Sequence, residues 1–461
     1  MTPVFRRIII LTCLVLAALT PLRAATAQQG QRLSLIRDAE IESTLRIFVT
    51  PIWRAAGLDP AALEIMIVQD GALNAFVAAG QRIFLNTGLL MRTERPNQLI
   101  GVLAHETGHV AGGHLARLQE ELRDLSTLQI IEAILSAGAM AGSAVSGGSG
   151  TSRPGPTGPG SAQAPGSLLS FLKYTQTQEN AADQAAITYL ERTQQSPKGT
   201  VEFLRVLLQQ ERMMIGRRNP YLSTHPLTPE RIDAFEAAAA RSPYANTPDS
   251  PRFLELHQRM IAKLWGFISP GAALQRYSEG DRSVPARYAR AIALYRQGAL
   301  GSALLTIDGL LKEHPNDPYF HELRGQMLFE NGRAAEAIPS YRRAVQLLPQ
   351  IGIVKIDLAR ALLETNRPEN DREAVRNLEL AATQSESNSF ELWRLMASGY
   401  SRLNNPGMTS LARAEMAVIR GQRSEAQVHA AAAERQLQPG TPAWHRAQDL
   451  KAYINSRPRK N

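Results

Sequence analysis

The sequence predicts an α+β domain, mostly helical with a small sheet, followed by an all-α array of repeated helices. Three observations support this fold class. Three short runs typical of strands lie between residues 63 and 85. Longer stretches with helical spacing of their apolar residues follow them. Beyond residue 283 the helical pattern recurs with a period of about 34 residues. At 461 residues the chain is long enough for about two or three domains.

The N-terminal segment has the features of a secretory signal peptide. Arg6 and Arg7 precede a short apolar run, and Ala25-Thr26-Ala27 forms an A-x-A cleavage site. We therefore expect residues 1–27 to be removed and the mature chain to be exported from the cytoplasm. The apolar run is short for a membrane span, and an uncleaved anchor is the alternative. No other stretch of the sequence is long and apolar enough to span a bilayer.

The composition excludes several classes of function. The net charge of +9 is spread along the chain without a nucleic-acid-binding motif, so we do not expect nucleic acid as a partner. The single cysteine, Cys13, lies in the apolar run that is removed with the signal peptide. The mature chain is therefore expected to contain no thiol and no disulfide, which excludes cysteine catalysis and cysteine-ligated zinc.

The first domain, residues 28–270, is predicted to begin with one helix and a small group of strands. Residues 33–48 have amphipathic spacing, and we expect this helix to end before Pro51, because proline lacks the N–H that a helix interior uses. The runs typical of strands are 63–68, 74–78 and 82–85. Ala79-Gly80-Gln81 between the last two predicts a hairpin.

Helices are predicted over most of the remaining first domain, at 97–118, 122–140, 168–191, 198–215, 228–241 and 250–267. Residues 141–167 interrupt them with Gly, Ser, Pro and Ala, a composition that buries too little apolar surface to order itself. We expect a mobile loop there, which is either a lid over the site or a tolerated surface insertion. Residues 269–282 form the predicted junction to the second domain, 271–461.

The stretch His105-Glu106-Thr107-Gly108-His109 carries the strongest chemical signal. Positions four apart lie on one face of a helix, so His105 and His109 can bind one zinc ion through neutral ring nitrogens. A glutamate directly after the first histidine can reach a water molecule at the metal and act as general base. The alternative is two satisfied histidines on an apolar helix.

A third ligand is predicted on the helix that follows the Gly/Pro-rich segment. Glu179 and Asp183 are four residues apart and share a face, as in zinc peptidases whose distant helix supplies a glutamate. The aspartate one turn later then accepts a hydrogen bond from a ligand histidine, which we expect to be His105, and fixes its tautomer. An exposed acidic pair is the alternative.

His114 is a competing candidate for the third ligand. Zinc peptidases with three histidine ligands place the last one three residues after a glycine that corresponds to Gly112, and that position is Leu115 here. His114 lies one residue early and points away from His105 and His109 on a continuing helix. We therefore reject His114 as a ligand and keep only a supporting role for it.

Together these segments resemble the HtpX-type family of zinc peptidases. The resemblance covers about residues 33–240 and rests on Asn74-Ala-Phe-Val, Ile83-Phe-Leu-Asn-Thr-Gly-Leu-Leu90, Ala104-His-Glu-Thr-Gly-His109 and Glu179-Asn-Ala-Ala-Asp183, in that order. Thr224-His225-Pro226, followed by Arg231-Ile232, also resembles the family's pattern. The lack of membrane spans points to the soluble, exported branch with a C-terminal repeat domain.

The resemblance implies a zincin-like metallopeptidase fold with one zinc ion per chain. It further implies that His225 is a regulatory fourth ligand, which occupies the open zinc position at rest, and that Arg231 stabilises the oxyanion. It also implies a periplasmic protein in quality control, peripheral to the outer membrane, which acts on misfolded or stalled outer-membrane proteins. The outer-membrane β-barrel assembly machinery is then the expected partner of the repeats.

The second domain matches the tetratricopeptide pattern. Small, large and aromatic residues fall at the expected positions of one unit, at Gly325, Leu328, Ala337, Tyr341, Ala344 and Pro349. The same pattern recurs one period earlier and, after a short insertion, one period later. We therefore expect roughly four or five helix pairs over residues 283–456, stacked into a solenoid. An ordinary helical bundle is the alternative, and whether Arg290, Arg324, Arg343 and Arg360 make one face basic stays open.

The sequence as a whole predicts an exported zinc endopeptidase. His105, His109 and Glu179 hold the zinc, and Glu106 takes a proton from the attacking water and returns it to the leaving amine. Unfolded or misassembled polypeptides are the expected substrates, held extended along a strand edge near residues 74–81. The alternative is a chaperone or adaptor that acts through the repeats, with a latched or mainly structural zinc site.

Overall fold

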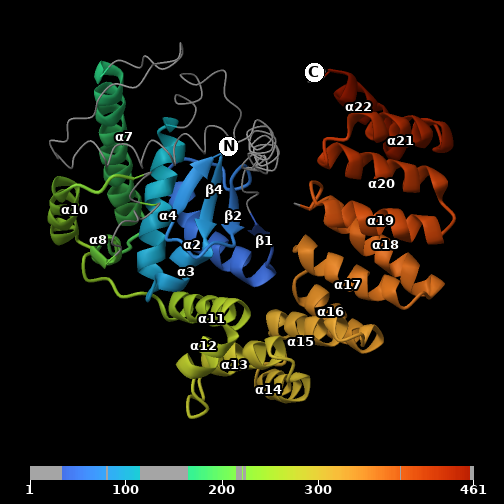
Figure 1. The fold of residues 1–461 in the computed structure, drawn as a ribbon, viewed down its shortest axis with the longest axis horizontal. Coiled ribbons are helices and arrows are strands. Elements are labelled where there is room, and N and C mark those ends of the chain that lie inside the picture. Colours follow the sequence, from blue (N-terminus) through green and yellow to red (C-terminus); the bar gives the residue numbers. More distant parts are fainter. Residues whose placement is uncertain are drawn as a thin grey trace, which may run out of the picture. The chain divides into compact units, whose positions relative to one another are not determined.

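The computed structural model describes residues 34–78, 81–114, 165–213, 221, 225–384 and 386–456. The predicted signal peptide, the helix at 122–140, most of the segment 141–167 and the turn at 79–80 lie outside the described residues. Figure 1 shows a small sheet with helices around it, followed by a long series of helices, α13 to α22. The predicted fold class is confirmed.

The sheet has the strand order β1-β2-β4-β3, with bounds Leu35–Ile36, Glu64–Val68, Ala75–Ala78 and Arg82–Asn86 for β1 to β4. Strand β2 pairs with β4 in parallel, and β3 pairs with β4 in antiparallel orientation. Phe76 lies opposite Phe84, and their rings stack with centroids 5.0 Å apart. Ile83 and Leu85 point to the other face and are fully buried, which gives β4 the alternation expected of a strand. Strand β3 is therefore at one edge of this sheet.

Helix α2 (Ala39–Ala55) corrects two predictions for the first helix. It begins later than expected, since β1 precedes it and Asp38 caps it by accepting a hydrogen bond from Ile41 N at 2.9 Å. It also continues through Pro51 instead of ending there. A proline in a helix interior costs about 3 kcal/mol. Ile52 and Trp53 are fully buried beyond it, and burial of two such side chains contributes about 3–6 kcal/mol, which outweighs that cost.

The other helices of the first domain pack around the sheet and around α4 (Pro96–Ala111). They are α3 (Thr87–Arg92), α7 (Pro165–Arg192), α8 (Lys198–Met213), α10 (Pro229–Arg241) and α11 (Pro251–Ile268). Side chains from the sheet and from α2, α4, α7, α8 and α11 share one hydrophobic core. Helix α4 is buried from Pro96 to Gly108, which explains why its sequence lacks a polar face.

Two glycines of α4 let neighbouring helices approach closely. A side-chain carbon at Gly108 would lie 2.8 Å from the backbone oxygen of Ala182 in α7, and one at Gly101 would lie 2.0 Å from Thr200 Oγ1 in α8. Residues with a Cβ atom therefore cannot occupy these positions without a shift of the partner helix. The glycine inside the His-Glu-Thr-Gly-His motif thus brings α4 and α7 together.

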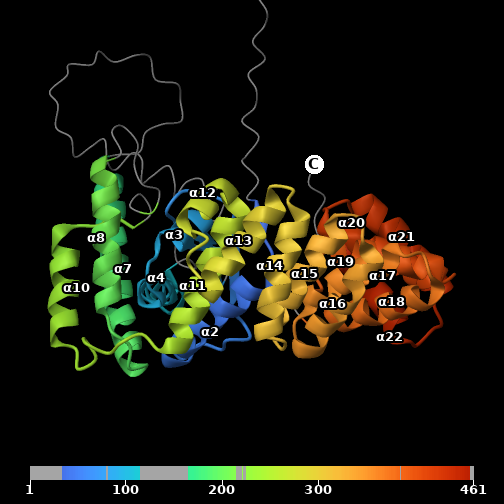
Figure 2. The ribbon, with the colours of Figure 1, turned by 90° about the horizontal axis from the view of Figure 1, so that it is seen from below.

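The second domain consists of helices that pair in chain order, and the pairs contact one another in succession (Figure 2). After the short helix α12 (Pro270–Arg276), the helices are α13 (Val284–Arg296), α14 (Leu300–Glu313), α15 (Pro318–Glu330), α16 (Ala334–Leu347), α17 (Gly352–Glu364), α18 (Pro368–Ala382), α19 (Phe390–Arg402), α20 (Pro406–Ile419), α21 (Arg423–Gln436) and α22 (Pro442–Ser456). Gly325 of α15 faces the ring of Tyr341 of α16, where a Cβ atom would be 2.9 Å from the ring. This contact explains the small and aromatic residues of the repeat pattern.

Two of the four repeated arginines are paired with carboxylates, and the other two have neutral acceptors. Arg324 donates to Asp308 Oδ1 at 2.7 Å, and Arg360 lies 3.0 Å from Asp357 Oδ1 and 3.2 Å from Glu391 Oε1. Arg290 donates to backbone carbonyl oxygens, and Arg343 donates to side-chain amide oxygens. Among the residues that the structure describes, no helix is both long and apolar enough to cross a membrane.

Candidate metal centre

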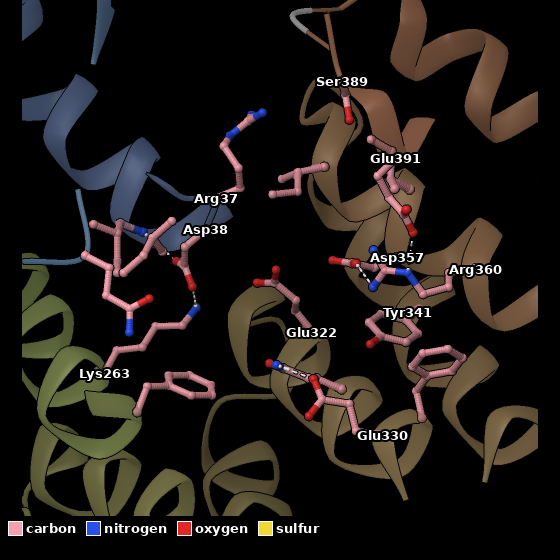
Figure 3. Close-up of a pocket in the computed structure, with 18 of the residues that line it drawn as sticks. Arg37, Asp38, Lys263, Glu322, Glu330, Tyr341, Asp357, Arg360, Ser389 and Glu391 are labelled. Atoms are coloured by element: carbon pink, nitrogen blue, oxygen red, sulfur yellow. Dashed lines mark hydrogen bonds and ion pairs between the residues drawn. The ribbon is translucent and has the colours of Figure 1, made fainter. Parts of the chain in front are cut away.

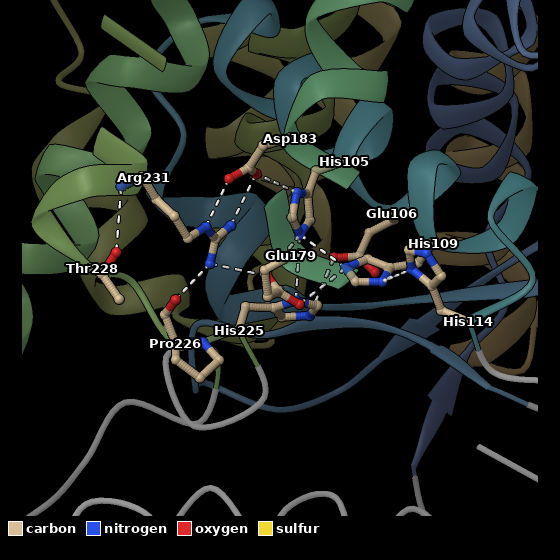
Figure 4. A network of polar contacts seen from close by, with 10 residues as sticks. All are labelled: His105, Glu106, His109, His114, Glu179, Asp183, His225, Pro226, Thr228 and Arg231. Carbon is tan, nitrogen blue, oxygen red and sulfur yellow. Dashed lines mark hydrogen bonds and ion pairs between the residues drawn. The ribbon is translucent and has the colours of Figure 1, made fainter. Parts of the chain in front are cut away.

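The predicted site residues come from three parts of the first domain and meet beside α4 (Figure 4). Helix α4 supplies His105, Glu106 and His109, helix α7 supplies Glu179 and Asp183, and the segment at the start of α10 supplies His225 and Arg231. One ligand atom from each of His105, His109, Glu179 and His225 lies within 4.8 Å of all the others. The structure thus brings together four residues that are separated by up to 120 positions in the chain.

The distances between these ligand atoms suit a small tetrahedral cation. His105 Nε2 lies 3.1 Å from His109 Nε2 and 3.3 Å from His225 Nδ1. Glu179 Oε1 lies 3.2 Å from His109 Nε2 and 3.0 Å from His225 Nδ1. With metal–ligand bonds of about 2.0–2.1 Å, the ligand atoms of a tetrahedral zinc site are about 3.3 Å apart. The residues present therefore fit zinc.

Hydrogen bonds on the far side of two histidines support the same conclusion. His105 Nδ1 lies 2.9 Å from Asp183 Oδ1, and a carboxylate there requires the ring to carry its proton on Nδ1. His109 Nδ1 lies 2.9 Å from His114 Nδ1, so that nitrogen also has a polar partner. The Nε2 atoms of His105 and His109, which face each other, are then left with their lone pairs for a metal.

The electrostatics of the centre favour an added positive charge. Burial alone would lower the pKa of His105, but its hydrogen bonds to Asp183 and Glu179 outweigh burial and raise the pKa to about 10. Burial lowers the pKa of His109, and the positive charge of His105 acts in the same direction. Burial opposes ionisation of Glu179, yet the neighbouring histidines hold its pKa well below its usual range. The cluster thus stabilises a cation among its rings, as a metal site does.

Glu106 is placed as a free acceptor next to the cluster. Its side chain is fully buried, and neither carboxylate oxygen has a hydrogen-bond partner among the described residues. Its Oε1 lies 3.6 Å from His225 Nε2. A buried carboxylate without a hydrogen-bond partner is costly, and the role of Glu106 as general base stays a prediction.

Arg231 holds two of the acidic residues in place. It donates to Asp183 through Nε at 2.7 Å and through a terminal nitrogen at 2.9 Å, and another nitrogen lies 3.0 Å from Glu179 Oε2. It also donates to the carbonyl oxygen of Pro226 at 2.6 Å, which fixes the segment that carries His225. In this arrangement the guanidinium group positions ligands, whereas the sequence suggested an oxyanion role. That oxyanion role stays a prediction.

Tyr221 is a neighbour of the site that the sequence analysis missed. Its ring lies 4.7 Å from the His225 ring, and His225 N donates to Tyr221 O at 2.7 Å. Burial raises the pKa of its phenol well above the usual value. The spacing of four residues between an aromatic ring and a histidine was the available signal. The prediction that His114 points away from His109 on a continuing helix was wrong. Helix α4 ends at Ala111, Gly113 has φ +62°, and His114 Nδ1 lies 2.9 Å from His109 Nδ1.

The close contact between α4 and α7 leads to a testable expectation for Gly108. Gly108→Ala introduces a carbon atom against the Ala182 backbone, so α7 must move and carry Glu179 away from His105. We expect zinc affinity to fall by about 10–100-fold, as for changes that misplace a ligand. Competition with a zinc-binding dye measures this affinity.

Gly101→Ala is the matched control for that substitution, because Gly101 lies on the same helix but faces Thr200 of α8. Both variants should lower the unfolding temperature, but only Gly108→Ala should weaken zinc binding. Equal zinc affinity in the two variants would show that the α4–α7 contact does not position the ligands.

Comparison with known proteins adds an independent line of evidence. Residues 36–239 match the family model described as Peptidase family M48, and residues 288–350 match a tetratricopeptide repeat model. The chain is 26% identical over 370 residues to the "Beta-barrel assembly-enhancing protease" of Yersinia pestis, with 78% of this chain and 72% of that protein covered. It is 26% identical over 377 residues to the protein of the same name from Escherichia coli K12, with 79% and 72% covered. The predicted order of a peptidase domain and tetratricopeptide repeats is confirmed.

Proposed function

From the match of residues 36–239 to peptidase family M48, we propose that this chain is an exported zinc endopeptidase of protein quality control. The observation that supports the chemistry best is the convergence of His105, His109 and Glu179 beside the unpartnered carboxylate of Glu106. Two imidazoles and one carboxylate are typical ligands of catalytic zinc, which keeps a further position available.

The roles of the residues follow from their contacts. Zinc at this centre would supply a Lewis acid that polarises a peptide carbonyl and lowers the pKa of a water molecule. Glu106 can take a proton from the attacking water and pass it to the leaving amine, because its oxygens have no hydrogen-bond partner among the described residues. Asp183 keeps the His105 ring oriented, and Arg231 fixes the positions of the Asp183 and Glu179 carboxylates by ion pairs to both.

We propose unfolded or misassembled outer-membrane polypeptides as the substrates. The name of the relatives refers to assembly of β-barrels, and residues 1–27 have the pattern of a signal peptide that is cleaved after Ala27. Edge strand β3 offers backbone groups to an extended chain, which favours unfolded substrates over one sequence motif. We place the protein in the periplasm, where the repeats would contact the β-barrel assembly machinery.

A direct test of this function pairs metal analysis with proteolysis. The purified mature chain should contain about one zinc ion per molecule and should degrade an unfolded test protein. Incubation with a chelator should remove both the metal and the activity, and added zinc should restore them. Zinc-independent degradation would contradict the proposal.

We also propose that His225 closes the centre at rest. Its Nδ1 atom lies 3.0 Å from Glu179 Oε1, and its Nε2 atom lies 3.6 Å from Glu106 Oε1. One ring thus contacts both a proposed ligand and the proposed base. A fourth protein ligand fills the position that substrate or water would take, so the ring must move away before cleavage.

His225→Ala should therefore raise the rate of proteolysis. A closed state that is favoured by about 1–2 kcal/mol corresponds to a rise of about 5–30-fold when the closing group is removed. The rate of degradation of an unfolded protein and the zinc content are measured together, with the exposed His445→Ala as a control. An unchanged rate at full zinc occupancy would refute the latch.

The same contacts also favour a second candidate function, a chaperone or adaptor whose zinc site is kept closed while the repeats bind clients. Complementation of a deletion strain separates the two functions. If Glu106→Gln restores every phenotype, chaperoning dominates. If a fragment of residues 28–270 restores them, the repeats are dispensable. That division into residues 28–270 and 271–461 is itself part of the proposal.

A further inference from the structure

A cavity of about 470 Å³ lies against the repeat helices (Figure 3), and none of the proposed zinc ligands lines it. Glu322 of α15, Tyr341 of α16 and Asp357 of α17 line one side of it, and Asp38 and Lys263 line the other. Phe329, Ile353 and Ile356 add apolar wall. The cavity therefore combines a charged lining with room for an extended side chain.

Among the described carboxylates of this lining, Glu322 is the one with a buried oxygen that has no hydrogen-bond partner. It is only 8% exposed, and its Oε2 atom has no hydrogen-bond partner among the described residues. Figure 3 shows its carboxylate directed into the cavity. Three basic groups that line the cavity are paired with other carboxylates: Lys263 with Asp38 at 2.8 Å, Arg37 with Glu386 at 2.8 Å, and Arg360 with Asp357 at 3.0 Å. Arg296 lines the cavity as well.

The buried acids of this lining would gain from a positively charged group. Burial raises the pKa of Glu322 to about 8, and burial raises the pKa of Asp357 to about 6. An unpaired buried acid destabilises the folded chain, and such costs persist mainly where a ligand relieves them. A positively charged group that enters the cavity would supply the donor that Oε2 lacks.

The chemistry of the lining selects among cations. Within the described parts of the chain, the histidine and glutamate cluster near α4 is the group that could hold a metal ion, and the acids of this cavity do not form another. A guanidinium group presents a rigid fork that needs paired acceptors, whereas an ammonium group is a compact point charge on a flexible apolar stem. The single free oxygen and the apolar wall suit the ammonium group.

We propose that this cavity binds a primary ammonium group presented by a polypeptide, with Glu322 as its ionic partner. A lysine side chain supplies the charge and a stem of methylene groups that packs on Phe329 and Ile356. The repeat array would thereby capture lysine-bearing segments of a client. The proposal does not depend on cleavage, so it stands or falls separately from the zinc chemistry.

Binding of synthetic peptides to the full chain tests this proposal. The chain carries Glu106→Gln so that peptides stay intact, and fluorescence anisotropy reports binding. The probe is a labelled, N-acetylated, unstructured peptide with one central lysine. Its twin carries norleucine, which keeps the stem and lacks the charge. We expect the lysine peptide to bind at least about 10-fold more tightly, and Glu322→Gln to remove most of that difference.

The matched control is Glu391→Gln, because Glu391 lines the same cavity but already accepts hydrogen bonds from Arg360 and Arg394. This variant should change affinity by less than about fivefold. A third peptide, with norleucine and a free N-terminus, tells whether a chain terminus can supply the ammonium group. If the three peptides bind equally to the chain that carries only Glu106→Gln, the proposal is overturned, and no substitution in the cavity is needed to reach that result. The proposal would also be overturned if a folded Glu322→Gln protein bound the lysine peptide as tightly as the protein with Glu322 intact.

Discussion

Replacing Glu106 with glutamine is expected to abolish proteolysis while zinc stays bound. The amide keeps the size of the side chain but cannot accept the proton of the attacking water, and general base catalysis contributes about 10²–10⁴-fold to rate. None of the four ligand atoms belongs to Glu106, so the metal should remain at about one ion per chain. The measurement is the rate of degradation of an unfolded protein, with zinc content determined on the same sample.

Glu230→Gln is the control for that experiment, because it makes the same chemical change on an exposed side chain in the first turn of α10. It should leave both rate and zinc content unchanged. Retention of more than about one tenth of the activity by Glu106→Gln, with zinc in place, would sink the assignment of the base. Loss of zinc from Glu106→Gln would instead mean that this residue supports the metal.

Replacing Glu179 with glutamine is expected to weaken zinc binding, and proteolysis should be lost as a consequence of the lost metal. The carboxylate lies 3.2 Å from His109 Nε2 and 3.4 Å from His105 Nε2, and it is the charged member of the ligand set. A neutral amide is a poor zinc ligand, so affinity should fall by more than the 10–100-fold that is usual for groups behind the ligands. Zinc titration against a competing chelator measures the change.

Asp183→Asn provides the comparison, since Asp183 contacts His105 Nδ1 and Arg231 but contributes no atom to the cluster. Its zinc affinity should fall less, by about 10–100-fold. Activity of both variants should return partly at high zinc concentration. If Glu179→Gln binds zinc as tightly as the parent chain, the third ligand has been assigned wrongly.

The elements with regular periodicity could be predicted from sequence. The strands at 63–68, 74–78 and 82–85 agree with β2, β3 and β4 to within one residue at each end. Their alternation and apolar content are local properties, so they need no information about distant residues. The start of the helix of the His-Glu-Thr-Gly-His motif was predictable for the same reason, but α4 ends at Ala111 and not at residue 118, because Gly112 caps it and Gly113 has φ +62°.

The first helix shows where local rules fail. Proline predicts a helix end, and α2 nevertheless continues to Ala55 because Ile52 and Trp53 are buried in the core. That burial depends on side chains from α4 and α11, which lie far away in the sequence. A rule based on neighbouring residues cannot include this term, which here exceeds the cost of the proline.

The sequence by itself predicted that the two imidazoles of the centre lie together, since residues spaced by one helical turn must share a face. Tertiary structure alone decided that Arg231 contacts Asp183 and Glu179, that Tyr221 packs on His225, and that Glu322 lacks a partner. The physical reason is that spacing along one helix is fixed by backbone geometry, whereas contacts between helices depend on how whole faces pack. Gly108 connects helix spacing with helix packing. It lies within the motif on α4, and because it has no Cβ atom α7 can approach closely enough to place Glu179 near His105 and His109.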